Sequence, residues 1–234
     1  MTPPSPHSAG LLPEADQRLV RTVDGLTDVE LSQSSLLPGW TRAHVVAHLA
    51  LNGEALVRVL AGQRAGTPAT MYDSQEARDR DIEDLAAADP SELRDRLLAS
   101  TNGFERELDR LSEEAAAATF ERTPGGQVIP VGQVPAMRLR EVEIHHADLD
   151  AGYSAADWPP EFCAVLIESM ARFRDGAPFR VLARDLARTW QLGDGEGGPV
   201  IAGDAAALGW WLTGRGDGEG LDSDSGTLPE VGPW

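Results

Sequence analysis

The sequence is poor in cysteine and in basic side chains. Its only cysteine is Cys163, so one chain can form neither an internal disulfide nor a metal cluster of several thiolates. Lys and Arg together number 20 against 38 Asp and Glu, which gives a formal net charge of -18. A field of this sign repels phosphate backbones and anionic lipid surfaces. We therefore expect no nucleic-acid partner, no membrane partner and a cytoplasmic location.

The sequence also lacks a segment that we interpret as a signal or a membrane anchor. Residues 1–10 carry Pro and Ser but no basic stretch followed by an apolar core. No later run is expected to reach the length needed to span a bilayer. The remaining composition, 41% hydrophobic and 25% charged over 234 residues, is enough for one large globular domain or two modest ones.

Apolar residues recur at helical spacing through the first two thirds of the chain. Thr41 can cap a helix whose apolar face continues to Leu60, before glycines end the pattern. A capping-box spacing over residues 27–30 predicts a short helical piece before the Pro38-Gly39 turn. Further helices are predicted over residues 12–26, 74–88, 90–111 and 134–152, with a loop around 124–130. Four long antiparallel helices predict an up-and-down four-helix bundle, which we assign to residues 1–156.

The pattern changes after the Trp158-Pro159-Pro160 segment. A helix is predicted over residues 161–173, and Asp204 can cap a last helix that runs to Leu212. Between these helices, short runs rich in β-branched and aromatic residues predict strands over residues 179–183, 188–192 and 199–202. We therefore expect a small α+β domain over residues 157–234, so the fold class of the whole chain is α+β.

Three side chains form a candidate metal site. Glu141 and His145 are four residues apart on one predicted helix, so both can serve as ligands from the same face. His48 lies on another predicted helix that can face the first one. Two imidazoles and one carboxylate leave coordination positions open on zinc, as in catalytic rather than structural sites. The alternative is that Glu141 and His145 form only a solvated pair.

Several blocks of the sequence resemble one known family. They are Gly39-Trp40-Thr41 with His48, Met71-Tyr72, Glu76-Ala77-Arg78, Arg140 to His145 with Asp148-Leu149, and Thr213-Gly214-Arg215-Gly216. Together they are similar to the mycothiol-dependent maleylpyruvate isomerases. The resemblance implies a DinB-like metal-binding bundle followed by a small α+β domain. It also implies His48, Glu141 and His145 as metal ligands, Arg215 as a catalytic residue, and mycothiol and a divalent metal, preferably zinc, as cofactors.

The resemblance implies a reaction as well. A metal-activated mycothiol thiolate would add to the cis double bond of maleylpyruvate, the bond would rotate, and elimination would give fumarylpyruvate, a step of aromatic catabolism through gentisate. The partners would be a small dicarboxylate keto acid and a low-molecular-weight thiol. Two alternatives stay open: a mycothiol S-transferase acting on another electrophile, and a non-enzymatic, metal-stabilised binding module.

Other polar residues receive less specific predictions. His44 and His146 flank the candidate ligands and should point away from them, toward the surface or toward the outer side of the ligands. Arg215 could be no more than a charge on a loop. Cys163 lies in an apolar helical run and is expected in the core, so any reactive thiol must come from outside the chain.

Overall fold

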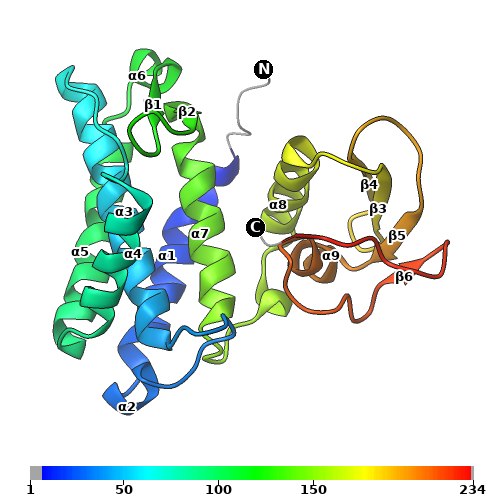
Figure 1. Cartoon of the computed structure of the whole chain (residues 1–234), viewed down its shortest axis with the longest axis horizontal. Coiled ribbons are helices and arrows are strands. Elements are labelled where there is room, and N and C mark those ends of the chain that lie inside the picture. Colours follow the sequence, from blue (N-terminus) through cyan, green and yellow to red (C-terminus); the bar gives the residue numbers. More distant parts are fainter. Residues whose placement is uncertain (1–6, 233–234) are drawn as a thin grey trace. The chain divides into compact units, whose positions relative to one another are not determined.

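The computed structural model describes residues 7–232 of the chain. The chain divides into two compact units, Met1–Gly152 and Tyr153–Trp234. The first unit is helical, and the second combines helices with a sheet (Figure 1). The boundary expected from sequence, between residues 156 and 157, falls slightly later, within the short 3-10 helix η2 (Ala155–Asp157).

Four long helices form the bundle of the first unit, and this confirms the predicted fold class. They are α1 (His7–Gly25), α3 (Arg42–Ala65), α5 (Pro90–Leu108) and α7 (Val134–Asp148). The largest interfaces join α3 to α5 and α1 to α7, while smaller ones join α3 to α7 and α1 to α5. Between α3 and α5 the chain passes through α4 (Gln75–Ala86), which packs on α3 (Figure 1). The candidate ligand helices, α3 and α7, are thus neighbours in the bundle.

Helix α3 is the central helix of this unit. It begins after Thr41, whose side chain and backbone both pair with His44 in a capping box, and it ends at Gly66, whose φ of 69° suits glycine. By length and composition α3 could cross a bilayer, contrary to the expectation from sequence. However, 67% of its most apolar window is buried inside the protein, as in the core helix of a soluble protein.

Short elements complete the first unit. They are α2 (Asp28–Leu31), α6 (Glu113–Ala117), β1 (Thr119–Glu121), β2 (Val128–Pro130) and the 3-10 helix η1 (Val131–Gln133). The capping box predicted at residues 27–30 is present, with Thr27 and Glu30 each bonded to the other's backbone. The expected loop around 124–130 is instead part of a hairpin, in which β1 and β2 pair antiparallel. These strands are too short to give a period-two pattern.

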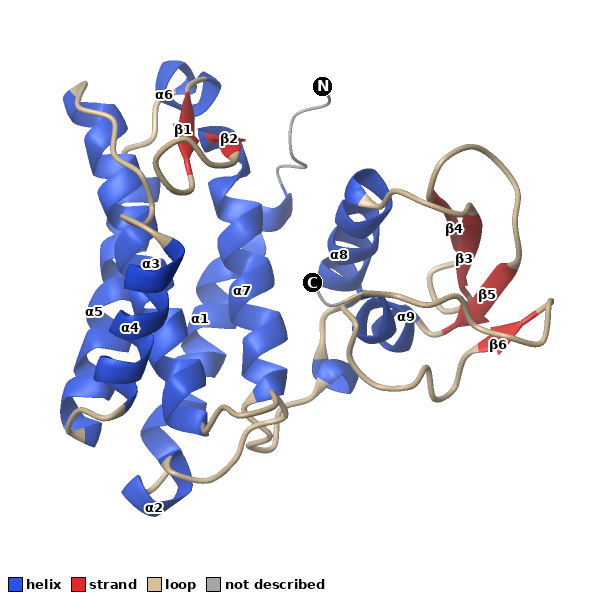
Figure 2. Ribbon diagram, viewed as in Figure 1, coloured by secondary structure: helices blue, strands red, loops and turns tan. Residues whose placement is uncertain are grey.

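The second unit folds helices α8 and α9 against a four-stranded mixed sheet (Figure 2). Its elements are α8 (Pro160–Phe173), β3 (Phe179–Ala183), β4 (Arg188–Leu192), β5 (Val200–Gly203), α9 (Ala205–Leu212) and β6 (Asp222–Ser223). The sheet order is β4-β3-β5-β6, and only the β3–β5 pair is parallel. Buried Phe179 and Trp211 pack with ring centroids 5.8 Å apart, which fixes α9 on the sheet. The predicted strands are confirmed, and β6 is an addition to them.

Candidate metal centre

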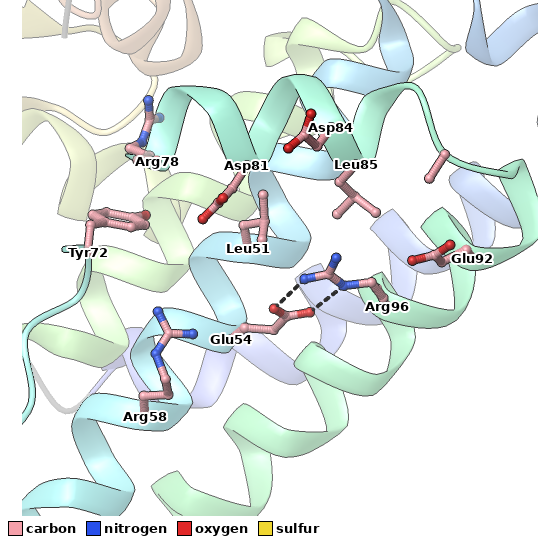
Figure 3. Close-up of a pocket in the computed structure, with 11 residues that line it drawn as sticks. Leu51, Glu54, Arg58, Tyr72, Arg78, Asp81, Asp84, Leu85, Glu92 and Arg96 are labelled. Atoms are coloured by element: carbon pink, nitrogen blue, oxygen red, sulfur yellow. Dashed lines mark hydrogen bonds and ion pairs between the residues drawn. The ribbon is translucent and has the colours of Figure 1, made fainter. Parts of the chain in front are cut away.

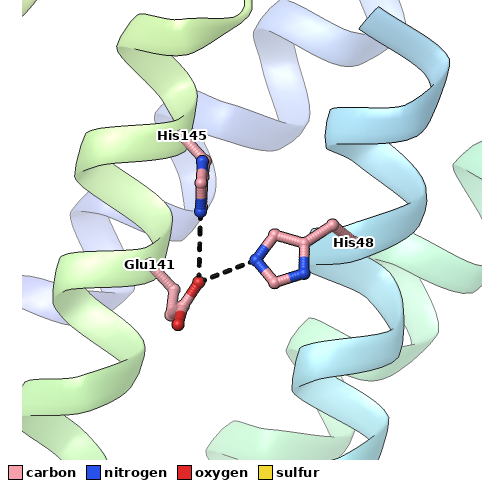
Figure 4. A group of neighbouring side chains, drawn as sticks. All are labelled: His48, Glu141 and His145. Carbon is pink, nitrogen blue, oxygen red and sulfur yellow. Dashed lines mark hydrogen bonds and ion pairs between the residues drawn. The ribbon is translucent and has the colours of Figure 1, made fainter. Parts of the chain in front are cut away.

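Helices α3 and α7 bring His48, Glu141 and His145 together (Figure 4). One candidate ligand atom from each residue lies within 4.8 Å of the other two. The Glu141 Oε2 atom is 2.9 Å from His48 Nε2 and 3.4 Å from His145 Nε2. The two imidazole rings meet edge to face, with centroids 4.7 Å apart. The two Nε2 atoms and one carboxylate oxygen therefore converge on a single small volume.

The outer nitrogen of His145 faces a buried carboxylate. His145 Nδ1 donates to Asp148 Oδ2 at 2.8 Å, and Asp148 is fully buried at the end of the same helix. Burial lowers the pKa of His145, but hydrogen bonds to Asp148 and Glu141 outweigh it and leave that pKa raised. Because Asp148 keeps a proton on Nδ1, loss of the proton from Nε2 would leave a lone pair on the side of Glu141. A carboxylate behind a histidine is the usual support of a metal ligand.

The outer nitrogen of His48 faces a cation instead. Arg78 Nη2 lies 3.1 Å from His48 Nδ1, so Nδ1 accepts and the ring proton lies on Nε2, toward Glu141. Burial lowers the pKa of His48 to about 4, which keeps the ring neutral. The indole ring of Trp40 packs against this imidazole, at 5.8 Å between centroids.

Glu141 completes the donor set as an ionised carboxylate. Burial raises its pKa, but hydrogen bonds from His145 and His48 reverse the effect and hold the pKa well below its usual value. Its side chain remains 20% exposed, so the site is accessible from solvent. Two neutral imidazoles and one carboxylate are the protein ligands of several open zinc sites, and the three residues therefore fit a divalent metal.

Comparisons with known proteins agree with this geometry. A family model described as the mycothiol maleylpyruvate isomerase N-terminal domain matches residues 12–150. The chain belongs to this family.

Two solved structures extend the likeness to the second unit. They are the mycothiol-dependent maleylpyruvate isomerase and a histidine-to-alanine mutant of it. Each is 27% identical to this chain and covers 97% of it and 96% of its own length, with TM-scores of 0.85 and 0.86. YfiT from Bacillus subtilis, described as having an unusual four-helix bundle topology, is 19% identical over 62% of this chain and 82% of its own, with a TM-score of 0.51. It supports the fold alone. No curated protein sequence shows significant similarity.

The two histidines that flank the candidate ligands have partners away from the centre. His44 shares Nδ1 with Thr41 and places Nε2 3.2 Å from Glu83. His146 is buried, and its Nε2 lies 2.8 Å from the hydroxyl of Thr22 on α1. His44 and His146 therefore serve helix capping and helix packing, and the expectation of a surface position is wrong for His146.

Arg215 belongs to the second unit, between two glycines with positive φ, Gly214 at 75° and Gly216 at 67°. Its guanidinium lies 5.7 Å from the centre of the Trp210 ring, and Nη1 donates to the Thr213 carbonyl at 3.2 Å. These contacts hold the arginine against its own loop. A catalytic role for Arg215 stays a prediction. Cys163 is buried in α8, which confirms its predicted place in the core.

Two residues beside the centre received no role from sequence reasoning. Asp148 follows His145 by three residues on α7, a spacing that permits the contact but is common in helices. Arg78 was noted only as part of a block shared with the family, without a role of its own. It also lines a cavity of about 440 Å³ between α3, α4 and α5, together with Tyr72 and Arg58 (Figure 3). The cavity wall includes an ion pair in which Arg96 donates two hydrogen bonds to Glu54.

Proposed function

We propose that this protein is a mycothiol-dependent maleylpyruvate isomerase, which converts the cis double bond of maleylpyruvate into the trans bond of fumarylpyruvate. The observation that carries the proposal is the convergence of His48, Glu141 and His145 within 4.8 Å in a chain of this family. The likeness to a solved isomerase over 97% of the chain supports extending the proposal to the second unit.

The three residues would hold one divalent metal, and zinc is the metal that suits two imidazoles and a carboxylate best. When bound, the metal would supply Lewis acidity that lowers the pKa of a thiol, so that mycothiol could add reversibly to the double bond as a thiolate. Asp148 would keep the proton of His145 on Nδ1, so that Nε2 could present its lone pair to the metal. Glu141, already ionised, contributes a negative charge without a proton having to leave first.

Arg215 is proposed to bind a carboxylate of the substrate. A dicarboxylate keto acid must approach a protein of net charge -18, and a local cation offsets that repulsion. A guanidinium can hold a carboxylate through two hydrogen bonds and can stabilise negative charge that develops on the substrate. The positive φ of Gly214 and Gly216 shapes the loop that presents it.

The test is an assay of the purified, metal-loaded protein with mycothiol and maleylpyruvate. The proposal predicts trans product only when the metal and mycothiol are both present, with the thiol recovered unchanged. Consumption of the thiol by a generic electrophile, without isomerisation, would establish a mycothiol S-transferase instead. Absence of turnover, together with a lower unfolding temperature after metal removal, would establish a metal-stabilised binding module.

Cys163→Ala is the control for the source of the thiol. Because Cys163 is buried in the second unit, thiol-dependent turnover should persist in this variant. Loss of all turnover in a stably folded Cys163→Ala protein would indicate a nucleophile within the chain.

A further inference from the structure

Arg138 is a cation with no exposed surface in the helix that carries two of the candidate ligands. It precedes Glu141 by three residues on α7, which places it one helical turn before the metal centre. Asp16 on α1 is its ion-pair partner, but the closest approach, from Nη2 to Oδ1, is 3.9 Å and too long for a hydrogen bond. Buried ion pairs are weak evidence for stability, because desolvation costs about as much as the pair returns.

The hydrogen bonds of Arg138 are directed at the other ligand helix. Its Nη1 atom donates to the carbonyl oxygen of Leu49 at 2.8 Å and to Oδ1 of Asn52 at 3.0 Å, both on α3. Leu49 directly follows His48. One guanidinium thus bridges α7 to the turn of α3 that presents the third ligand.

The surrounding residues leave room for this bridge. A Cβ atom at Gly53 would lie 3.3 Å from Arg138 Nη2 and 2.9 Å from the hydroxyl oxygen of Ser100. Any side chain at position 53 would therefore press on the guanidinium. Glycine inside a helix is unfavourable by itself, so its presence here serves the close approach of Ser100 on α5 and of Arg138.

The other contact of His48 comes from α4. Arg78 Nη2 lies 3.1 Å from His48 Nδ1, and its guanidinium carbon lies 5.8 Å from the centre of the Tyr72 ring. Arg138 therefore acts on the backbone beside His48, whereas Arg78 contacts the ring itself.

We propose that Arg138 is a positioning residue of the metal centre, which sets the distance between His48 on α3 and the Glu141/His145 pair on α7. The inference rests on the metal site of the proposed function, but it requires neither mycothiol nor isomerisation. It predicts that Arg138 controls metal affinity and ligand geometry in the absence of any substrate.

The experiment titrates the metal-free, full-length protein with Co²⁺ and records affinity and the visible absorption spectrum. The test variant is Arg138→Met combined with Asp16→Asn, because methionine alone would leave the Asp16 carboxylate buried without a cation. Asp16→Asn by itself is the control for that change. We expect the combined variant to bind Co²⁺ about tenfold or more weakly and to show an altered spectrum, as when other supports of metal ligands are removed.

A second interhelical ion pair in the bundle serves as a control that separates ligand positioning from protein stability. Arg96 on α5 donates to Glu54 on α3 at 2.9 and 2.7 Å, so this pair joins α3 to a helix that carries no candidate ligand. Arg96→Met combined with Glu54→Gln should leave Co²⁺ affinity and spectrum unchanged, whatever it does to stability. Arg138→Lys, which keeps the charge but not the paired donors, should fall between the wild type and the methionine variant.

Asn52→Ala provides a milder variant if the methionine protein does not fold. It removes one acceptor of Arg138 and should weaken Co²⁺ binding in the same direction, by a few fold. Wild-type affinity and spectrum in Asn52→Ala and in every folded Arg138 variant would overturn the proposal while leaving the metal centre intact. A wild-type protein that binds no Co²⁺ would overturn the metal centre, and the positioning role with it.

Discussion

The outer sides of the two candidate histidine ligands differ in charge. His145 Nδ1 faces the Asp148 carboxylate at 2.8 Å, whereas His48 Nδ1 faces the Arg78 guanidinium at 3.1 Å. The carboxylate holds a proton on the outer nitrogen of His145, so Nε2 would offer its lone pair to a metal once it has lost its own proton. The guanidinium places the His48 proton on Nε2, where a metal would bind.

This difference assigns different tasks to the two sides of the centre. His145 is preorganised by its own helix. If Nε2 of His48 bound a metal, the ring proton would move to Nδ1, because a neutral imidazole keeps one N–H, and Arg78 could then no longer donate to it. Metal binding would therefore release Arg78 from His48, next to the cavity that Arg78 lines.

The largest effect is expected when one of the three candidate ligands is itself removed. Replacing His48, Glu141 or His145 by alanine should reduce metal content from about one ion per chain to a small fraction, and activity with it, since two ligands hold zinc poorly. Metal analysis of the purified variants measures this directly. Full metal retention by all three single variants would rule out the site.

Asp148→Asn changes the residue behind His145. Metal affinity should fall by about 10- to 100-fold, because the amide no longer fixes the His145 tautomer. The pH dependence should change as well. The hydrogen bond to Asp148 raises the pKa of His145, so protons compete with metal below that raised value, and without the carboxylate the competition should begin at a lower pH.

Zinc competition titrations at several pH values measure both effects of Asp148→Asn. The control is Asp150→Asn, which makes the same charge change at a residue where φ is 52°, a conformation that asparagine tolerates. Equal affinity and equal pH dependence in the two variants would show that Asp148 does not support the site.

Arg215→Lys tests the arginine that is predicted to bind the substrate, in contrast to Arg78, which contacts His48. Lysine keeps the charge but not the planar pair of donors, so kcat/KM should fall about tenfold or more, while metal content stays unchanged. Steady-state kinetics on metal-replete protein measures this. Wild-type kinetics would return Arg215 to the status of a loop charge.

Arg78→Gln changes the residue behind His48. It should have the smallest effect on metal affinity, and it should raise that affinity rather than lower it. Without the guanidinium, the His48 proton moves to Nδ1 at no loss of a hydrogen bond, and one positive charge near the metal disappears. Metal affinity should rise by about 2- to 10-fold, which corresponds to one ordinary hydrogen bond. Arg58→Gln is the control, because Arg58 lines the same cavity but donates to the Met71 carbonyl. Weaker metal binding in Arg78→Gln, with unchanged binding in Arg58→Gln, would contradict a competition between Arg78 and the metal for His48.

Much of this arrangement could be predicted from sequence because it depends on local spacing. The i,i+4 relation of Glu141 and His145 needs only a helix, and the bundle follows from apolar periodicity along α1 and α5 and from the long apolar run of α3. Strands β3 and β4 were predicted with their observed bounds, since alternation and turn residues mark both of them.

What could not be predicted depends on contacts between distant segments. Arg78 reaches His48 across 30 residues, and Arg138 reaches Leu49 across 89, so no local pattern marks either pair. Asp148 is close to His145 in sequence, yet many helices carry that spacing without a hydrogen bond. The β1–β2 hairpin was missed because each of its strands has three residues.

Anomalous diffraction from crystals of the zinc-loaded protein, at the zinc absorption edge, tests the metal centre most directly. We expect one anomalous peak at about 2.0–2.2 Å from His48 Nε2, His145 Nε2 and a Glu141 carboxylate oxygen, with at least one coordination position free of protein ligands. A peak at another place, or a fourth protein ligand that closes the site, would contradict this expectation.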